Sequence, residues 1–194
     1  MKVRILFLIC FLCITCLLNA ADKPVIQIHT DNSSLIFHVA DNGRLYQSYL
    51  GKKLNHETDI SHLPQGTEAY ITHGMEDYFE PAIHILHNDG NPSLLLKYVS
   101  HETKAVSQGV NETIITLGDD KYPVTVKLHY VTYPAEDIIK TYTEISHKEK
   151  KPVVLHQYAS SMLHLNRAKY YLTEFSGDWA HEANVTEREL AFGK

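Results

Sequence analysis

The chain has 194 residues, of which 44% are apolar and 21% are charged, and it carries a formal net charge of −5 at pH 7. This composition is typical of a globular protein, excludes a disordered or collagen-like chain, and fits one domain. A net negative charge without a block of Lys or Arg argues against nucleic acid and anionic membrane surfaces as partners.

The N-terminus begins with an apolar segment. Two cations, Lys2 and Arg4, precede a 14-residue apolar run, and small residues follow it. This order is typical of a secretory signal peptide, because the apolar stretch is too short to span a membrane comfortably. We predict a signal peptide over residues 1–20, cleaved after Ala20 or Ala21, and therefore an exported protein that is periplasmic or secreted. The alternative is an uncleaved anchor.

The cysteines all fall within this segment, at Cys10, Cys13 and Cys16. The mature chain, residues 21–194, therefore contains none, which excludes disulfides, thiolate zinc sites and cysteine nucleophiles. Loss of the two cations changes the formal net charge from −5 to −7.

Short strands separated by turn signals follow from residue 25 onward. Turn formers such as Asp41-Asn42-Gly43 divide them, and no window of 12 or more residues keeps a helical period. Residues 124–133 alternate apolar and polar side chains, the pattern of a sheet with one face toward solvent. The segments expected to form strands are Val25–Thr30, Ser34–Val39, Arg44–Leu50, Ile83–His87, Leu94–Val99, Thr113–Leu117, Val124–Tyr133, Ile138–Ser146, Val153–Tyr158, Met162–Leu165 and Tyr170–Phe175.

The spacing of these strands predicts the fold class. It indicates an all-β fold, an antiparallel β-sandwich, with no linker that would separate two domains. Residues 176–194 alternate like a further strand approaching another and then stop at Gly193-Lys194. We therefore expect the sandwich over residues 21–194 to be incomplete at its C-terminus, as in a truncated gene product or a fragment.

Thirteen histidines raise the question of a metal site. None of them lies in an HxxxH or HExxH pattern on a helix, and His84 and His87 project to opposite faces of a strand. We therefore expect no metal and no cofactor. No GxSxG elbow frames a serine, and no pair of carboxylates has the fixed separation that a glycosidase needs. The sequence alone assigns no catalytic residue.

Two features could bind a sugar. Residues 70–82 form a loop dense in aromatic and acidic side chains, including Glu76 and Asp77, ahead of a strand. Carboxylates accept hydrogen bonds from sugar hydroxyls and aromatic rings cover sugar C–H surfaces. On composition alone, a structured surface loop without a ligand is the alternative. Trp179, the single tryptophan, belongs either to the core or to a ligand platform.

Three ordered blocks resemble glycoside hydrolase family 36, the α-galactosidases. Residues 66–102 contain Asp77-Tyr-Phe-Glu-Pro-Ala82 and Tyr98-Val-Ser-His-Glu102, which are similar to a family segment that runs aspartate, aromatic, arginine, x, proline, alanine and ends in tyrosine-x-serine-histidine. Residues 133–146 resemble the next strand pair. Residues 170–182 are similar to the aromatic-x-glycine-x-tryptophan-x-x-glutamate segment.

The resemblance implies a large enzyme with an amino-terminal β-sandwich, a (β/α)₈ barrel and a small β domain at the end. Such enzymes cleave terminal α-galactosides with retention, using two aspartates of the barrel. Because this chain ends inside the sandwich, we expect no catalytic residue in it and no hydrolase activity from it alone. The implied partners are an α-galactoside oligosaccharide, the catalytic barrel of the parent enzyme, and further copies in a homo-oligomer.

The resemblance also assigns candidate site residues. Asp77 and Trp179 match positions at which the family's sandwich contributes to the galactose pocket, of its own or a neighbouring subunit. Phe79 stands where the family usually has arginine, which removes a local ion pair and indicates other sugar preferences. The competing hypothesis is a stand-alone exported β-sandwich module that binds carbohydrate or protein.

Overall fold

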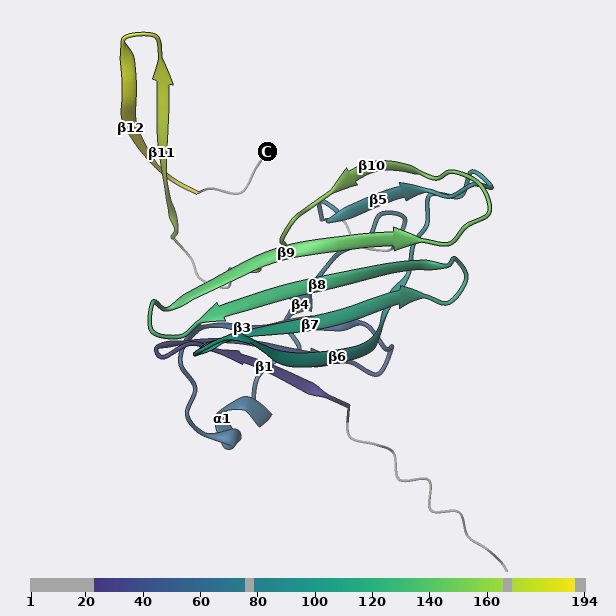
Figure 1. Cartoon of the computed structure of the whole chain (residues 1–194), viewed down its shortest axis with the longest axis horizontal. Coiled ribbons are helices and arrows are strands. Elements are labelled where there is room, and N and C mark those ends of the chain that lie inside the picture. The colour runs from purple at the N-terminus through teal and green to yellow at the C-terminus, as the bar shows by residue number, and fades with distance from the viewer. Residues whose placement is uncertain (1–22, 76–78, 166–168, 191–194) are drawn as a thin grey trace, which may run out of the picture.

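The computed structural model describes residues 23–75, 79–165 and 169–190 (Figure 1). The expected signal peptide and Asp77 lie outside these residues. The described elements are β1 (Val25–His29), β2 (Ser33–Val39), β3 (Leu45–Lys52), α1 (Glu57–Ser61), β4 (Thr67–Glu68), β5 (Ile83–Leu86), β6 (Leu96–Ser107), β7 (Val110–Asp119), β8 (Val124–Tyr133), β9 (Ile138–His147), β10 (Val154–Tyr158), β11 (Tyr171–Asp178) and β12 (His181–Glu189).

Two four-stranded sheets form the body of the molecule. Their strand orders are β1-β2-β3-β4 and β6-β7-β8-β9, and all neighbours pair antiparallel. The second sheet lies over the first in Figure 1, with β5 and β10 as a separate two-stranded sheet at one end. This arrangement confirms the predicted all-β antiparallel sandwich.

The core lies between the two large sheets. Phe37 on β2 and Tyr130 on β8 meet with ring centroids 5.2 Å apart. Val126 and Leu128 precede Tyr130 on the same face of β8 and are also buried in this core, which confirms the alternation predicted for residues 124–133. Burying each such side chain contributes about 1.5–3 kcal/mol, so this strand is a major source of stability.

The outer face of β8 is less exposed than the alternation predicted. His129 is buried there because the ring of Tyr142 stacks on it at a centroid distance of 4.2 Å. Nδ1 of His129 and the hydroxyl of Tyr142 both lie within hydrogen-bond distance of Oε1 of Glu112, at 2.9 and 2.6 Å, and Nζ of Lys104 lies 3.0 Å from Oε2. The hydrogen bonds from Tyr142, His129 and Lys104 lower the pKa of Glu112 from 4.5 to about 2.

One predicted strand is wrong. Residues 162–165 are irregular, and the buried side chain of Gln47 holds them. Its Nε2 donates to the carbonyl of His164 over 2.7 Å, and its Oε1 accepts the backbone N–H of His164 over 3.1 Å. An amide side chain thus takes the place of a neighbouring strand. Conversely, β6 extends eight residues beyond the predicted end at Val99, because it pairs with β7 along its length.

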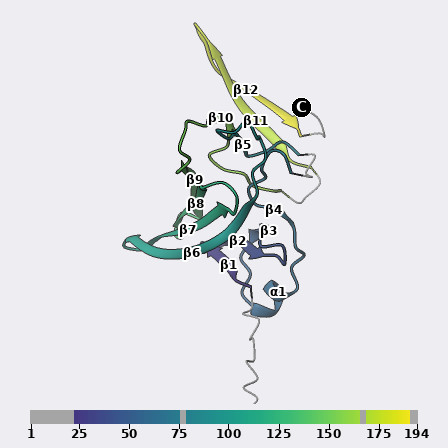
Figure 2. The same cartoon turned by 90° about the vertical axis from the view of Figure 1, so that its right-hand side faces the viewer.

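The last two strands form a hairpin apart from the sandwich. β11 and β12 pair antiparallel, which agrees with the prediction that residues after 176 approach another strand. Both Figure 1 and Figure 2 show this hairpin extending away from the large sheets. In the part of the chain that the structure describes, no helix has the length and hydropathy that a membrane span requires.

Candidate functional site

Trp179 lies at the tip of the hairpin, in the turn between β11 and β12. Its side chain is 92% exposed, so it does not belong to the core of the described chain. The backbone N–H of Trp179 donates to the Asp178 carboxylate over 2.7 Å. The next residue, Ala180, has φ of +62°, a left-handed conformation that is uncommon for a residue with a Cβ. The turn therefore presents the indole outward on a constrained backbone.

The hairpin also exposes an apolar face. Tyr171 and Phe175 lie on the same face of β11, and Phe175 pairs with Val185 of β12. All three are exposed, Phe175 by 73%. Across the described chain, the side-chain hydrogen bonds and the ion pair of residues 171–189 remain within the hairpin. An isolated two-stranded hairpin is marginally stable in water, so this face is suited to contact with another folded unit.

The loop predicted to carry Asp77 begins and ends on ordered backbone. Asp77 itself lies outside the described residues. On either side of it, the N–H of His73 donates to the carbonyl of Ile83 over 3.0 Å, and the N–H of Ala82 donates to the carbonyl of Ile71 over 2.7 Å. Phe79, the residue in place of the family arginine, is 63% exposed.

Gly74 fixes the entry to this loop. Its φ is +83°, and a Cβ there would lie 2.8 Å from Oγ and 2.9 Å from Cα of Ser93. A side chain at this position would therefore meet both backbone strain and a clash. The sequence places a glycine where the loop must pass close to the backbone before β6.

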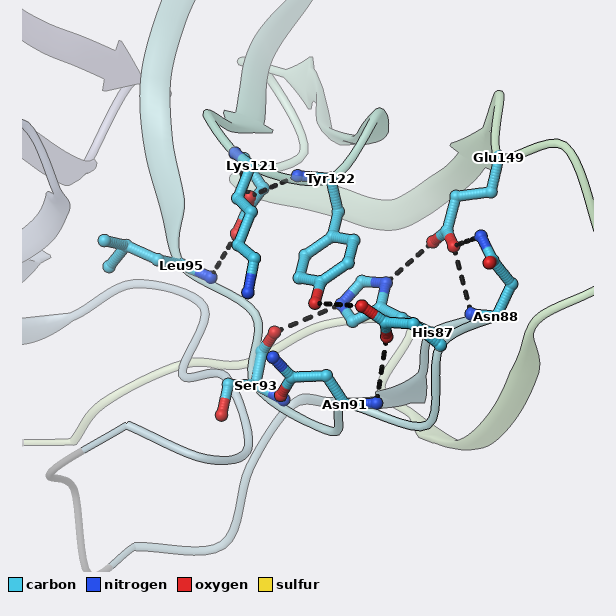
Figure 3. Close-up of polar contacts among 10 residues, drawn as sticks. His87, Asn88, Asn91, Ser93, Leu95, Lys121, Tyr122 and Glu149 are labelled. Carbon is cyan, nitrogen blue, oxygen red and sulfur yellow. Dashed lines mark hydrogen bonds and ion pairs between the residues drawn. The ribbon is translucent and has the colours of Figure 1, made fainter.

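A buried ion pair lies beside this region (Figure 3). Nδ1 of His87 lies 2.7 Å from Oε1 of Glu149, and its Nε2 lies 3.1 Å from the carbonyl oxygen of Ser93. Both ring nitrogens face acceptors, an arrangement that only the doubly protonated imidazolium satisfies in full. Burial raises the pKa of the Glu149 carboxyl, but hydrogen bonds from His87 and Asn88 outweigh it and the net shift is downward. The ring of Tyr122 covers His87 with centroids 3.5 Å apart.

The neighbouring turn is held by a second carboxylate. Asp119, the last residue of β7, accepts the N–H groups of Leu95 and Tyr122 over 2.6 and 2.8 Å. A cavity of about 200 Å³ opens here between Met75 and Asp119, and another of about 250 Å³ lies between α1 and the sheet that includes β2. Both are smaller than the roughly 300–1,000 Å³ of a typical ligand pocket. Asp119 therefore serves to position loops, and the two cavities are too small for an oligosaccharide.

The histidines include a cluster that sequence reasoning missed. The ring of His84 stacks on that of His73 and meets that of His156 at a tilted angle. No spacing links them in the sequence, because the pairing of β5 with β10 brings them together. Among residues 23–75, 79–165 and 169–190, no group of three or more His, Cys, Asp and Glu side chains is arranged to hold a metal ion.

Fold and site together define a β-sandwich domain with a hairpin, β11 and β12, whose aromatic side chains are exposed to solvent. Residues 43–194 match the family model of the glycosyl hydrolase family 36 N-terminal domain. The chain belongs to this family, and the resemblance stated from the three sequence blocks is confirmed.

Known relatives are longer than this chain. Alpha-galactosidase 2 of Hypocrea jecorina is 28% identical in an alignment 133 residues long, which covers 62% of this chain and 18% of that protein. Probable alpha-galactosidase G of Aspergillus terreus is 23% identical in an alignment 184 residues long, which covers 82% of this chain and 25% of that protein. The chain thus spans about a fifth to a quarter of the curated relatives it matches.

Solved structures share the fold. The GH36 alpha-galactosidase AgaA from Geobacillus stearothermophilus superposes with a TM-score of 0.78 at 19% identity, over 88% of this chain and 28% of that chain. Variants of that enzyme have been crystallised in complex with raffinose and with stachyose.

Proposed function

We propose that this chain is the amino-terminal β-sandwich part of an exported, retaining α-galactosidase that hydrolyses terminal α-galactosides. The sandwich helps to shape the galactose pocket and carries no catalytic residue. The carboxylate pair of a retaining glycosidase, about 5–5.5 Å apart, is supplied by the barrel of the parent enzyme. Raffinose and stachyose, bound by variants of the AgaA enzyme, are the model substrates.

The observation that carries this proposal is the uncovered hairpin. Trp179 is 92% exposed at its tip, and Phe175 and Val185 form an exposed apolar pair along it. Such a surface gains stability only when a second folded unit buries it. The barrel of the same or a neighbouring subunit in a homo-oligomer provides that cover, and it brings the indole to the sugar.

Each proposed site residue has a distinct task. The Asp77 carboxylate accepts hydrogen bonds from two galactose hydroxyls, a charge-assisted contact that fixes the orientation of the ring. The face of Trp179 covers the apolar side of the sugar and excludes water. Neither group performs chemistry, but both hold the substrate where the barrel carboxylates react with it. Phe79 replaces the family's arginine with an apolar ring next to this loop.

Export follows from the N-terminal segment. A pair of cations, an apolar run and small residues precede the first strand, so the signal peptide is removed and the sandwich begins near residue 21. The enzyme therefore acts in the periplasm or outside the cell, where its oligosaccharide substrates reach it.

The proposal is tested on the whole gene product, including the sequence encoded downstream of Lys194. We expect turnover of aryl α-galactosides, raffinose and stachyose, no turnover of the matching β-galactoside, and α-galactose as the first product seen by NMR. A protein that binds galactosides but hydrolyses none of them would instead favour the stand-alone binding module. First release of β-galactose would reject retention.

A further inference from the structure

Three histidine rings form one stack between three segments of the chain. His73 lies before β5, His84 on β5 and His156 on β10, and Figure 1 shows β5 and β10 side by side. The ring centroids of His73 and His84 are 3.7 Å apart with planes at 22°, and those of His84 and His156 are 4.8 Å apart at 36°. His84 is thus the central ring of the three, and His73, His84 and His156 together form the histidine stack.

The histidine stack lies where β10 is attached to the fold. β10 pairs only with β5 among the described strands, over a short register that shifts between Leu155 and Gln157, at His156. Beyond the strand, the N–H of Ala159 donates to the carbonyl of Ala82 over 2.7 Å. The attachment therefore rests on few backbone hydrogen bonds, to which the contact between the rings of His84 and His156 and the hydrogen bonds of the Gln157 side chain add.

In the described segments around the stack, charged side chains are few. Residues 69–75, 79–86 and 154–159 contain one acidic residue, Glu80, and no Lys or Arg. The Glu80 carboxylate accepts a hydrogen bond from Nε2 of Gln157 on β10 over 3.2 Å. Among the described residues, the groups whose charges act on His84 are His73 on one side and His156 on the other.

Protonation works against this packing. Burial, then the neighbouring rings of His73 and His156, lower the pKa of His84 below its ordinary value of 6.5. A histidine with a lowered pKa binds fewer protons in the packed state than in the opened state, so acid favours opening. The stability that the stack contributes is present above about pH 6.5 and declines as the pH falls toward the lowered pKa of His84.

We propose that His73, His84 and His156 form a pH-sensitive contact that holds β10 on β5 when uncharged and releases it on acidification. Two or more imidazolium rings in contact repel each other, and repulsion between His84 and His156 weakens the pairing of β5 with β10.

Amide hydrogen exchange on the full chain at pH 7.5 and 5.5 tests this contact, with rates corrected for intrinsic exchange. We expect protection of β5 and β10 amides to fall about three- to ten-fold at the lower pH, while amides of β7 and β8 keep theirs. His84→Asn should remove most of that pH dependence. His147→Asn, a matched substitution at an exposed histidine outside the stack, should preserve it.

A second measurement keeps the proposal falsifiable if His84→Asn does not fold. His156→Asn removes the exposed end of the stack, and NMR titration of the remaining rings should then show a higher pKa for His84 than in the unmodified chain. Equal protection of β5 and β10 at both pH values, or an unchanged His84 titration in His156→Asn, would refute the contact. Neither readout involves a galactoside, so failure here is separate from failure of the proposed function.

Discussion

Replacing Trp179 with alanine separates a role in the site from a role in the fold. The side chain is 92% exposed, so folding buries only about 20 Å² of the roughly 250 Å² that an indole offers. At about 25 cal/mol per Å² this burial contributes about 0.5 kcal/mol, against about 3–5 kcal/mol for a core tryptophan. We therefore expect Trp179→Ala to lower the melting temperature of the full chain by no more than about 2 °C.

The same substitution should be costly in the parent enzyme. If the ring covers about 80 Å² of the sugar, its loss removes about 2 kcal/mol, or about 30-fold in kcat/KM for an aryl α-galactoside. Val106→Ala, at an exposed apolar position on β6, is the control and should change neither melting temperature nor kcat/KM. A large loss of stability with normal kinetics would refute the reasoning, because it would place the indole in a packed interior.

Three further predictions follow from individual side chains. Asp77→Ala in the parent enzyme should lower kcat/KM about 10- to 150-fold, because about 1.5–3 kcal/mol of charged hydrogen bonding is lost, and it should not change the melting temperature. Unchanged kinetics would mean that the loop does not bind the substrate. Because the pKa of Glu112 is about 2 in place of 4.5, its contribution to stability is present above pH 4.5 and is lost as the pH falls from 4.5 toward 2. Urea unfolding of Glu112→Gln should show a loss of about 1–3 kcal/mol at pH 7 and a shallower decline with acid, and equal acid sensitivity in both proteins would count against the network. Gly74→Ala should destabilise the chain by about 2–4 kcal/mol. Gly90→Ala should cost less, because Gly90 also has a positive φ, of +84°, but a Cβ there would meet nothing within 4 Å. Equal losses in the two variants would mean that the contact with Ser93 is unimportant.

The sandwich could be predicted because its strands carry a local signal. The bounds of β8 match the predicted segment, since ten residues alternate between the core and the outer face. The segment 162–165 is also largely apolar, but no described strand pairs with its backbone. Gln47 on β3 binds it through a side-chain amide instead, a contact that no local pattern reveals. The five-residue helix α1 is too short to show a helical period. Strand identity is local information, whereas the partner of a segment is not.

The site was predictable only in part. The resemblance selected Trp179, and the structure adds that the indole is at an exposed turn, a fact that depends on how β11 and β12 pair. The ion pair of His87 with Glu149 joins two loops distant in sequence, so neither residue stood out by spacing. The histidine stack could not be predicted for the same reason. Four strands, β6–β9, separate β5 from β10 in the sequence, although β5 and β10 pair in the fold.

The central claim is that this chain shapes a galactose pocket whose catalytic carboxylates lie elsewhere in the parent enzyme. The most direct test compares two purified proteins in one assay of aryl α-galactoside hydrolysis: the chain alone, and the chain joined to the sequence encoded downstream. We expect no release above a buffer blank from the first and steady turnover from the second. Turnover by the chain alone, in a preparation freed of host galactosidase, would contradict the claim, since it would require a catalytic pair within these residues.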